Sequence, residues 1–429
     1  MTEFPLFTVI IPQKNRAEYL RSTLQTCMAQ DYPNFEVIVS DDCSDDNSVD
    51  VVRDLQRVDS RIKLFAHKHH LGMRDNFEFA LSQVRPGFVM ALGGDDGLVP
   101  GSIWKMYRIL QDTGRQLLTW VPASFWYSTP DSNGKNILMI PRKKDHRTKI
   151  LKSSDFLKKI ANTFNYQIDE CPMFYIKGVA STDIIERVKS RTTDHSFYYC
   201  PTPDGFSGVV LAGEVEDYAY TEEPLSIGGT TIKSQGQNYR RTDKQSRKEA
   251  EQFFNDSVRR TMHSELASQP YSPLQTLMTA DYLLTAKDLP GWPGGCYEVS
   301  FDKLLRKSFY LMANNYYESE ILIRELKILR KIAKQHGLND LFDSLYHGLK
   351  RKYVSSPELY GHAITHSFRF EGTSMGITNI FEASNAVPFL SHYCSQSFFR
   401  YIYTVFVNDI KLLLRSRRFI KRDFPKIDE

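Results

Sequence analysis

Four apolar runs of strand length, each followed by a segment with helical spacing, constrain the fold of the N-terminal part (1–112) more than any other feature. The runs cover residues 7–12, 36–40, 62–65 and 88–92. They are continuous rather than alternating, as in strands that are buried on both faces. Between them, apolar residues recur every three or four positions, as in amphipathic helices. Strands and helices that alternate with short connections predict an α/β fold with a mainly parallel central sheet.

Acidic clusters follow the second and the fourth of these runs. Asp41 and Asp42 begin the first cluster, whose residues 44–46 are expected to cap the next helix. Asp95 and Asp96 form the second cluster, directly after two glycines. Ligands of such sheets bind beyond the carboxyl ends of the strands, so both clusters are expected at one site. A carboxylate pair can bind Mg²⁺ or Mn²⁺, which neutralises a diphosphate. A solvated acidic turn is the alternative interpretation, but the glycines favour a site because they leave room for a ligand.

Charge and cysteine content narrow the class of protein. The net charge of +4 is too small to indicate nucleic-acid binding by the whole chain. The six cysteines include no Cys-x-x-Cys pair, which is typical of reduced thiols in a cytosolic protein. No segment offers the roughly 20 apolar residues of a transmembrane helix. The sequence therefore predicts a cytoplasmic globular protein without a membrane span.

The C-terminal tail, residues 397–429, differs from the rest of the chain. It contains eight Lys or Arg residues against four Asp or Glu residues, and so accounts for the net positive charge. Its apolar residues are spaced roughly helically up to residue 413, and a basic run follows at 415–422. This pattern is typical of a helix on an anionic membrane surface, which predicts peripheral contact with the inner face of the cytoplasmic membrane. A helix packed on the domain, with a charged end, is the alternative.

The middle and the end of the chain have different patterns. Residues 113–240 are mixed, with short strands expected at 117–121 and 173–176. Beyond residue 243, helical spacing dominates, as at Leu322, Leu326 and Leu329. We therefore expect a mostly α-helical C-terminal region after the α/β part.

Three segments of the N-terminal part together resemble the bacterial family 2 glycosyltransferases with a GT-A fold. They read VIIPQKNRAEYLRSTLQTCMAQDYPNFEVIVSDDCSDDNSVDVV, HLGMRDNFEFAL and GFVMALGGDDGLVPGSI. PTPDGFSGVVLA and EEPLSIGGTTIKSQG, further on, are a looser match to the branch that serves surface polysaccharides. The resemblance implies a GT-A domain over 1–240, with a donor-binding half (1–112) and an acceptor and catalytic half (113–240). Residues 241–429 would form a helical C-terminal domain that includes the basic tail.

The resemblance also implies roles for individual residues. Those that would bind the nucleotide sugar lie in the loop after the first strand, in the first acidic cluster, on the third helix and in the second cluster: Pro12, Gln13, Asn15, Arg16, Asp41, Asp42, Arg74 and Asp95. One of Asp41 and Asp42 would accept from the base, and the sequence leaves open which. Asp95 and Asp96 would bind the metal, Mn²⁺ or Mg²⁺. Gly93 occupies the first acidic position of the commoner Asp-x-Asp-Asp motif, which leaves the ribose contact of that position open.

The reaction implied is inverting transfer of a sugar from a nucleotide-diphosphate sugar, with UDP sugars favoured. The acceptor would be a glycan or a lipid-linked glycan of lipopolysaccharide or capsule assembly. A carboxylate must deprotonate the acceptor hydroxyl, and the candidate is Asp204 in Thr-Pro-Asp-Gly. This segment is alternatively a simple turn, and Asp217 of the Glu-Asp pair is the rival base. The sequence leaves a homo-oligomer open.

Two other function classes remain as alternatives. A nucleotidyltransferase that makes the activated sugar would also use a nucleotide-binding sheet and Mg²⁺, but the segment PQKNRAEY lacks the expected glycines. A non-catalytic scaffold that has kept the fold is the other, because of Gly93. Residues 226–236 are glycine-rich and form either a lid over the donor or a passive loop. The histidines at 67–70 are expected in a solvated loop rather than a metal site.

Overall fold

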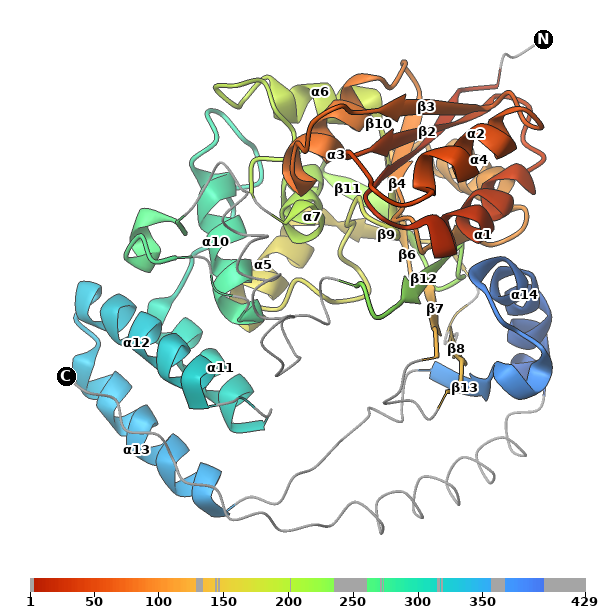
Figure 1. The fold of residues 1–429 in the computed structure, drawn as a ribbon. Coiled ribbons are helices and arrows are strands. Elements are labelled where there is room, and N and C mark those ends of the chain that lie inside the picture. The colour runs from red at the N-terminus through yellow and green to blue at the C-terminus, as the bar shows by residue number, and fades with distance from the viewer. Residues whose placement is uncertain are drawn as a thin grey trace.

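The computed structural model describes residues 4–128, 134–142, 145, 147–200, 202–234, 261–270, 272, 274–314, 317, 319–355 and 367–396. Its central sheet has the strand order β3-β2-β1-β4-β10-β6-β11-β9 (Figure 1). The strands are, in that order, β3 (Ile62–Ala66), β2 (Phe35–Asp41), β1 (Phe7–Gln13), β4 (Phe88–Ala91), β10 (Gly178–Ser181), β6 (Leu117–Trp120), β11 (Asp217–Thr221) and β9 (Lys149–Lys152). The first four are mutually parallel. β10 runs antiparallel to β4 and β6, and β9 runs antiparallel to β11. The predicted mainly parallel α/β sheet is confirmed.

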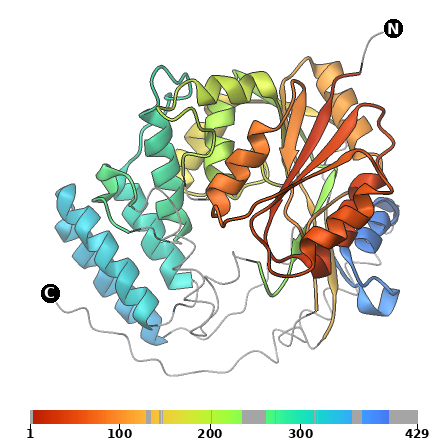
Figure 2. The same cartoon turned by 45° about the horizontal axis from the view of Figure 1, so that its top comes forward.

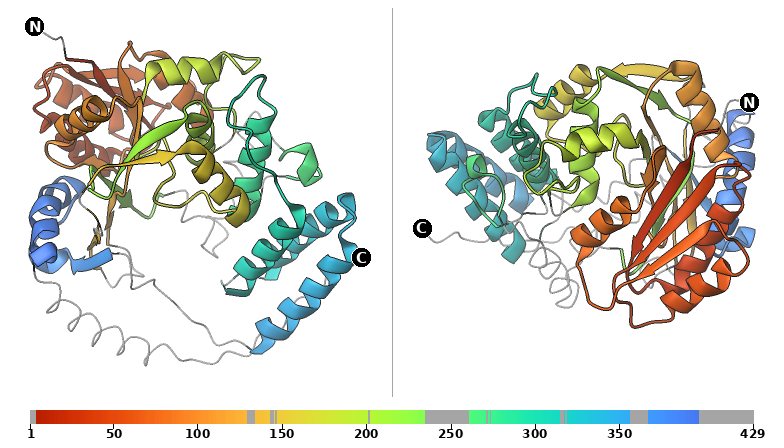
Figure 3. Two further views of the ribbon diagram at one scale, coloured as in Figure 1. Left: turned by 180° about the vertical axis from the view of Figure 1, so that it is seen from behind. Right: turned by 90° about the horizontal axis from the view of Figure 1, so that it is seen from above.

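Helices cover both faces of this sheet because its strands alternate apolar side chains between two cores. Ile10 and Ile38 face one core, whereas Val9 and Val37 face the other. The helices of the Ile10 side are α3 (Met73–Ser82), α5 (Ser153–Thr163), α6 (Thr182–Lys189) and α7 (Pro203–Gly213). Those of the Val9 side are α1 (Ala17–Met28), α2 (Ser48–Gln56) and α4 (Ser102–Thr113). The view from above shows the N-terminal strands between these layers (Figure 3).

A second, smaller sheet has the order β13-β8-β7-β12-β5. Its strands are β13 (Ser367–Glu371), β8 (Ile137–Pro141), β7 (Ala123–Trp126), β12 (Ser226–Thr230) and β5 (Gly97–Leu98). A short 3₁₀ turn, η3 (Thr373–Met375), leads to helix α14 (Ile380–Gln396), which packs on α1 and on this sheet. Residues from the end of the described chain thus lie beside the N-terminal domain, as the blue segment in Figure 1 shows.

The other C-terminal helices form a separate layer with its own core. They are η2 (Ser264–Leu266), α10 (Gln275–Lys287), α11 (Phe301–Asn314), α12 (Ser319–Gln335) and α13 (Asn339–Ser355). This helical layer stands to one side of the central sheet in both ribbon views (Figures 1 and 2). α10 connects it to the α/β part by packing on α5 and α7. None of the described helices is long and apolar enough to cross a membrane.

One local prediction was wrong, and a second concerns the start of a helix. Residues 173–176 form turns rather than a strand, and β10 begins only at Gly178. The turn is held from outside the segment, because the Lys177 ammonium donates to the carbonyls of Ile168 (2.8 Å) and Asp169 (3.0 Å). Helix α2 begins at Ser48, directly after Asn47. As expected of the segment 44–46, Asp46 serves this helix start, because its Oδ1 accepts from the Ser48 N–H (2.9 Å), while its Oδ2 accepts from the Ala17 N–H (3.1 Å).

Candidate active site

The ends of β1 and β2 build the first wall of the site. Gln13 and Asp41 are register partners at the carboxyl edge of the sheet, and the Gln13 amide nitrogen donates to Asp41 Oδ1. Both side chains are buried. Because Nε2 is fixed by Asp41, Gln13 Oε1 is left as a buried acceptor without a partner among the described residues.

The loops that follow β1 and β2 are joined to each other by hydrogen bonds. The Asn15 N–H donates to Ser44 Oγ (2.9 Å), and the Asp45 N–H donates to Asn15 Oδ1 (3.0 Å). Asn15 has a φ of 54°, a conformation that asparagine tolerates better than most residues. The Arg16 N–H donates to Ser48 Oγ at the start of α2. The structure therefore brings the predicted loop residues together in one braced pair of loops.

Asp41 and Asp42 both accept hydrogen bonds from backbone N–H groups of the loops around them. Asp41 Oδ2 accepts from the Ser44 N–H at 2.9 Å. Asp42 accepts from the backbone N–H groups of Leu71 (2.6 Å) and Gly72 (3.2 Å), and lies 2.8 Å from the His70 ring. Which of the two carboxylates meets a base stays open.

Asp95 and Asp96 lie buried at the end of β4. Asp96 accepts from the backbone N–H groups of Gly93 (2.7 Å) and Gly229 (2.8 Å), and the Tyr175 hydroxyl borders the same space beside Gly93 as Asp96 Oδ2. Asp95 Oδ2 accepts from the hydroxyl of Thr231 at 3.2 Å. Burial raises the pKa of Asp96 to about 7, and the charge of Asp95 adds to this. Burial also raises the pKa of Asp95. Two charged carboxylates are therefore costly at this place unless a cation balances them.

Arg16 and the turn after β12 complete the surroundings of the acidic pair. A Cβ at Gly94 would lie 2.9 Å from Arg16 Cβ, so Arg16 passes directly over the motif. Its guanidinium donates to the Lys233 carbonyl (2.8 Å), and the Lys233 ammonium donates to the Asn15 carbonyl (3.1 Å). Residues 231–234 thus cover the acidic pair and contact the β1 loop. Residues 235 and 236 of the predicted lid lie outside the described residues, as does the basic tail 397–429.

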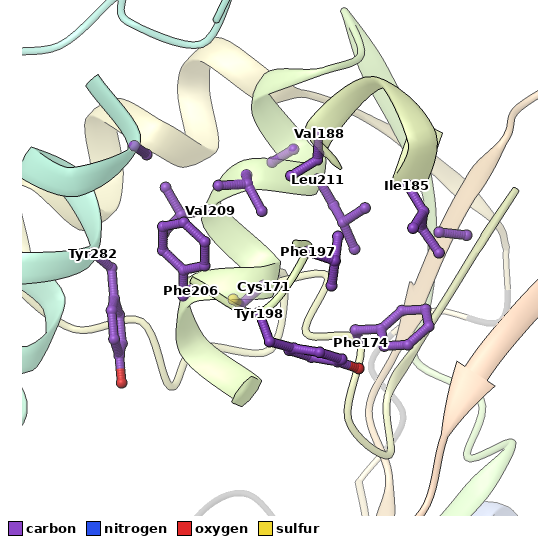
Figure 4. Packing of buried hydrophobic residues seen from close by; sticks show 14 of the residues in the cluster. Cys171, Phe174, Ile185, Val188, Phe197, Tyr198, Phe206, Val209, Leu211 and Tyr282 are labelled. Carbon is purple, nitrogen blue, oxygen red and sulfur yellow. The ribbon is translucent and has the colours of Figure 1, made fainter. Parts of the chain in front are cut away.

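Asp204 lies in the first turn of α7, directly after Pro203 at a helix start that suits proline. Burial raises the pKa of its carboxyl group. The helical layer contacts the start of α7, because Tyr282 of α10 forms a hydrogen bond with Thr202, the residue just before α7. Figure 4 shows the apolar side chains that pack around α7, with Tyr282 on its α10 side. Among the described residues, the structure gives Asp204 no direct contact with Asp95 or Asp96.

Two other predicted residues have structural partners. The Arg74 guanidinium donates to the Tyr198 carbonyl (2.5 Å), to Asp75 (2.6 Å) and to Asp194 (3.0 Å). Asp217, the rival base, pairs with Arg115 at 2.5 Å. The structure thus places Arg74 between α3 and the segment before α7, and Asp217 at the start of β11.

Three contacts of the acidic pair were not predicted from the sequence: Tyr175, Gly229 and Thr231. Tyr175 lay in the segment predicted as a strand, and Gly229 lay in the glycine-rich segment considered as a lid, but both are far from positions 95 and 96 along the chain. Thr231 lay in the segment considered as a lid, and only the pairing of β12 with β5 and β7 explains its position.

The donor atoms around the acidic pair fit a hard cation. Within the described residues, no group of three or more His, Cys, Asp or Glu side chains could hold a metal. Two carboxylates suffice for Mg²⁺ or Mn²⁺ when phosphate oxygens and water complete the shell. A Cβ at Gly93 would lie 2.5 Å from Tyr175 Oη, 2.8 Å from Asp96 Oδ2 and 3.1 Å from Asp95 Oδ1. Three oxygens therefore border this glycine, and no nitrogen or sulfur ligand is among them.

Comparison with known proteins agrees with this arrangement. Residues 8–168 match the family described as Glycosyl transferase family 2. The chain is 37% identical over 100 residues to the GalNAc(5)-diNAcBac-PP-undecaprenol beta-1,3-glucosyltransferase of Campylobacter jejuni, covering 23% of this chain and 32% of that protein. It is 30% identical over 92 residues to TuaG of Bacillus subtilis, named as a putative teichuronic acid biosynthesis glycosyltransferase, covering 21% and 36%. The chain thus spans about a third of the length of these relatives.

A solved structure shows the same fold. S. aureus TarS 1-349 in complex with UDP superposes with a TM-score of 0.50 at 13% identity, over 82% of this chain and 94% of TarS 1-349. At this identity the likeness shows the fold alone, and it agrees with a GT-A arrangement of the central sheet.

Proposed function

We propose that this chain, whose residues 8–168 match the family Glycosyl transferase family 2, transfers a sugar from a nucleotide-diphosphate sugar to a bacterial surface glycan. The observation that carries the proposal is the buried Asp95–Asp96 pair with Arg16 beside it, at the carboxyl edge of the sheet. Buried carboxylates without a cation are unfavourable, and a cation bridging to a diphosphate is the occupant that removes this cost.

The chemistry follows from the residues around the pair. A new bond forms between the acceptor oxygen and the anomeric carbon, while the bond from that carbon to the diphosphate breaks with inversion. Mg²⁺ or Mn²⁺ held by Asp95, with Asp96 beside it, would neutralise the leaving diphosphate. Arg16 adds a second positive charge at the same place. Asp204 takes the proton of the acceptor hydroxyl, and its raised pKa suits a general base near neutral pH.

Donor and acceptor classes are proposed from the relatives. The TarS structure is a complex with UDP, and the Campylobacter relative is named for a PP-undecaprenol-linked glycan. We therefore favour a UDP sugar as donor and a lipid-linked glycan as acceptor, in assembly of a lipopolysaccharide, a capsule or a related polymer on the cytoplasmic side.

A lipid-linked acceptor would lie at the membrane, where a basic tail could bind. We propose that residues 397–429 hold the enzyme at an anionic membrane, because eight basic residues accompany a helically spaced apolar stripe. The full chain should co-sediment with phosphatidylglycerol vesicles in low salt, and a chain ending at residue 396 should not. Equal sedimentation of both would remove this part of the proposal.

A nucleotide-sugar panel with Mn²⁺ tests the central proposal. Release of free nucleoside diphosphate supports sugar transfer, release of pyrophosphate supports a nucleotidyltransferase, and the absence of both supports a scaffold.

Asp204→Asn should keep donor binding and lower transfer by about 10²–10⁴-fold, the usual contribution of a general base. Asp217→Asn is the matched control, and its main effect should be on thermal stability through Arg115. Near-normal turnover of Asp204→Asn would reject Asp204 as the base.

A further inference from the structure

The space beside the glycine at position 93 is taken by the ends of neighbouring side chains, whereas its backbone conformation does not demand a glycine. Gly93 is absent from the residues with positive φ, so another residue could adopt its backbone. A Cβ at this position, however, would lie 2.5 Å from the Tyr175 hydroxyl and 2.8 Å from Asp96 Oδ2. Real Cβ atoms do not approach other atoms so closely. The place where the commoner motif carries its first acid is therefore already filled, and Tyr175 fills it.

Tyr175 is fixed to the acidic motif through its backbone as well as its hydroxyl. The segment 174–176 pairs with the last residue of β4, because the Ala91 N–H donates to the Phe174 carbonyl (3.2 Å) and the Ile176 N–H donates to the Ala91 carbonyl (2.8 Å). Ile176 has a φ of 54°, which is unusual for a β-branched residue. Its carbonyl accepts from the Ser226 hydroxyl of β12. The turn that aims Tyr175 is thus held from both sheets.

The hydroxyl of Tyr175 lies beside the donors around Asp96. That carboxylate receives one N–H from Gly93 and one from Gly229, and the Tyr175 hydroxyl, which borders the same space beside Gly93 as Asp96 Oδ2, favours its charged form. Asp95, by contrast, accepts from Thr231 and Ser234 on Oδ2, while Oδ1 borders Gly93. Both oxygens of Asp96 are therefore held by backbone N–H groups, whereas the hydroxyl donors to Asp95 all reach Oδ2 and leave Oδ1 on the Gly93 side.

We propose that Tyr175 is a positioning residue of the donor site, which takes the place of a side chain at position 93 and orients Asp96 behind Asp95. The proposal rests on the proposed function, since it assumes that the acidic pair serves a metal–diphosphate. It assigns the two carboxylates different tasks: Asp95 meets the cation, and Asp96 anchors the motif to β12. Tyr175 and a larger side chain at 93 exclude each other.

The first test compares Tyr175→Phe with Tyr198→Phe in the full chain. Tyr198 is a fitting control because its buried hydroxyl has no hydrogen-bond partner in the described part of the chain; its ring lies in the apolar cluster of Figure 4. UDP affinity is measured by calorimetry with and without Mn²⁺. The ratio of the two affinities should fall about tenfold in Tyr175→Phe, as for other residues that orient metal ligands, and stay unchanged in Tyr198→Phe. A purely structural role would lower the melting temperature but leave this ratio unchanged.

The second test is a double-mutant cycle between positions 93 and 175. Gly93→Ala should lower the melting temperature in the wild-type background, and less so in the Tyr175→Phe background, because the closest contact is then gone. Equal effects in both backgrounds, or an unchanged Mn²⁺ ratio in Tyr175→Phe, would overturn the inference. If the wild-type chain binds none of UDP, GDP, CDP or dTDP with Mn²⁺, the proposed function itself fails, and the inference with it.

Discussion

At the scale of single residues, burial decides what each acid of the site can do. Asp95 and Asp96 are 6% and 2% exposed, so their charges depend on partners rather than on water. Asp41 and Asp42 are also buried, and like Asp96 they accept from backbone N–H groups of neighbouring loops. Asp95 differs from these three acids, because the protein donors to its carboxylate are the hydroxyls of Thr231 and Ser234.

Asp95→Asn separates charge from shape at the acidic pair. The variant should bind Mn²⁺–UDP at least about tenfold more weakly, since a ligand charge is lost. Without metal it should be as stable as wild type or more so, because burial makes the charge unfavourable. Calorimetry gives the affinity and thermal unfolding without metal gives the stability, with the exposed Asp54→Asn as control. A marked drop in stability without metal would show that Asp95 is structural.

Gly229→Ala tests how closely β12 approaches the acidic motif. A Cβ at Gly229 would lie 1.8 Å from the Asp95 carbonyl oxygen, a clash with backbone that no rotamer relieves. We expect a loss of about 1–3 kcal/mol in unfolding free energy, typical of forced overpacking, together with weaker Mn²⁺–UDP binding. Gly295→Ala is the control, since its Cβ would meet nothing within 4 Å. Similar urea midpoints for both variants would contradict the packing described here.

At the scale of elements, a buried carboxylate on β2 forms ion pairs that connect this strand with its neighbours. Glu36 of β2 is 3% exposed and accepts from Arg85 at 2.7 Å and from Lys63 of β3. Burial alone would raise its pKa, but the hydrogen bonds from Arg85 and Lys63 outweigh burial and hold the pKa below its usual value. Glu36 is thus ionised at neutral pH and links three segments of the α/β part.

This lowered pKa sets the sign of a pH effect. Stability from Glu36 is fully present above its unfolded pKa of about 4.3 and is lost as the pH falls through the lower folded value. Glu36→Gln should therefore cost about 1–3 kcal/mol at pH 7, the worth of hydrogen bonds to a charged group. The difference from wild type should shrink between pH 5 and pH 3. Urea unfolding at several pH values checks this, and a difference that does not change with pH would contradict it.

At the scale of the whole molecule, a close contact at Trp292 adds to the packing of α10 on α5 and α7 between the helical layer and the α/β part. The Trp292 indole N–H donates to the Val210 carbonyl of α7 (3.3 Å), and its ring lies against Gly213, where a Cβ would be only 2.0 Å away. α10 packs along the same helix. Because α7 carries Asp204 at its other end, the position of the proposed base depends on helices that follow it in the chain.

Gly213→Ala should loosen this contact without touching the donor side. We expect a loss of about 1–3 kcal/mol from overpacking, faster hydrogen exchange in α7 and α10, and unchanged Mn²⁺–UDP affinity. Gly348→Ala is a matched helical glycine with open space around it, where alanine should stabilise by up to about 1 kcal/mol. Unchanged exchange in α10 of Gly213→Ala would show that the contact is not needed for docking.

The N-terminal part was predictable from the sequence because each of its signals is local. Strand runs, helical stripes and the acidic strand ends at 41–42 and 95–96 are readable within a few residues, and the parallel order brings the two clusters to one edge. The strand predicted at 173–176 was wrong because the conformation of this segment is not local, since Ala91 of β4 and Ser226 of β12 hold it by hydrogen bonds. How the chain divides into domains and which residues act in catalysis stay predictions.

The surroundings of the acidic pair depend instead on how distant segments pack. Tyr175, Gly229 and Thr231 reach Asp95 and Asp96 from parts of the chain far beyond β4, and no periodicity predicts contacts that depend on how two sheets meet. The glycine at position 93 illustrates the limit. In the sequence, Gly93 stands where the commoner motif has an acid. In the fold, the hydroxyl of Tyr175, from another segment, occupies the space where a side chain at position 93 would begin.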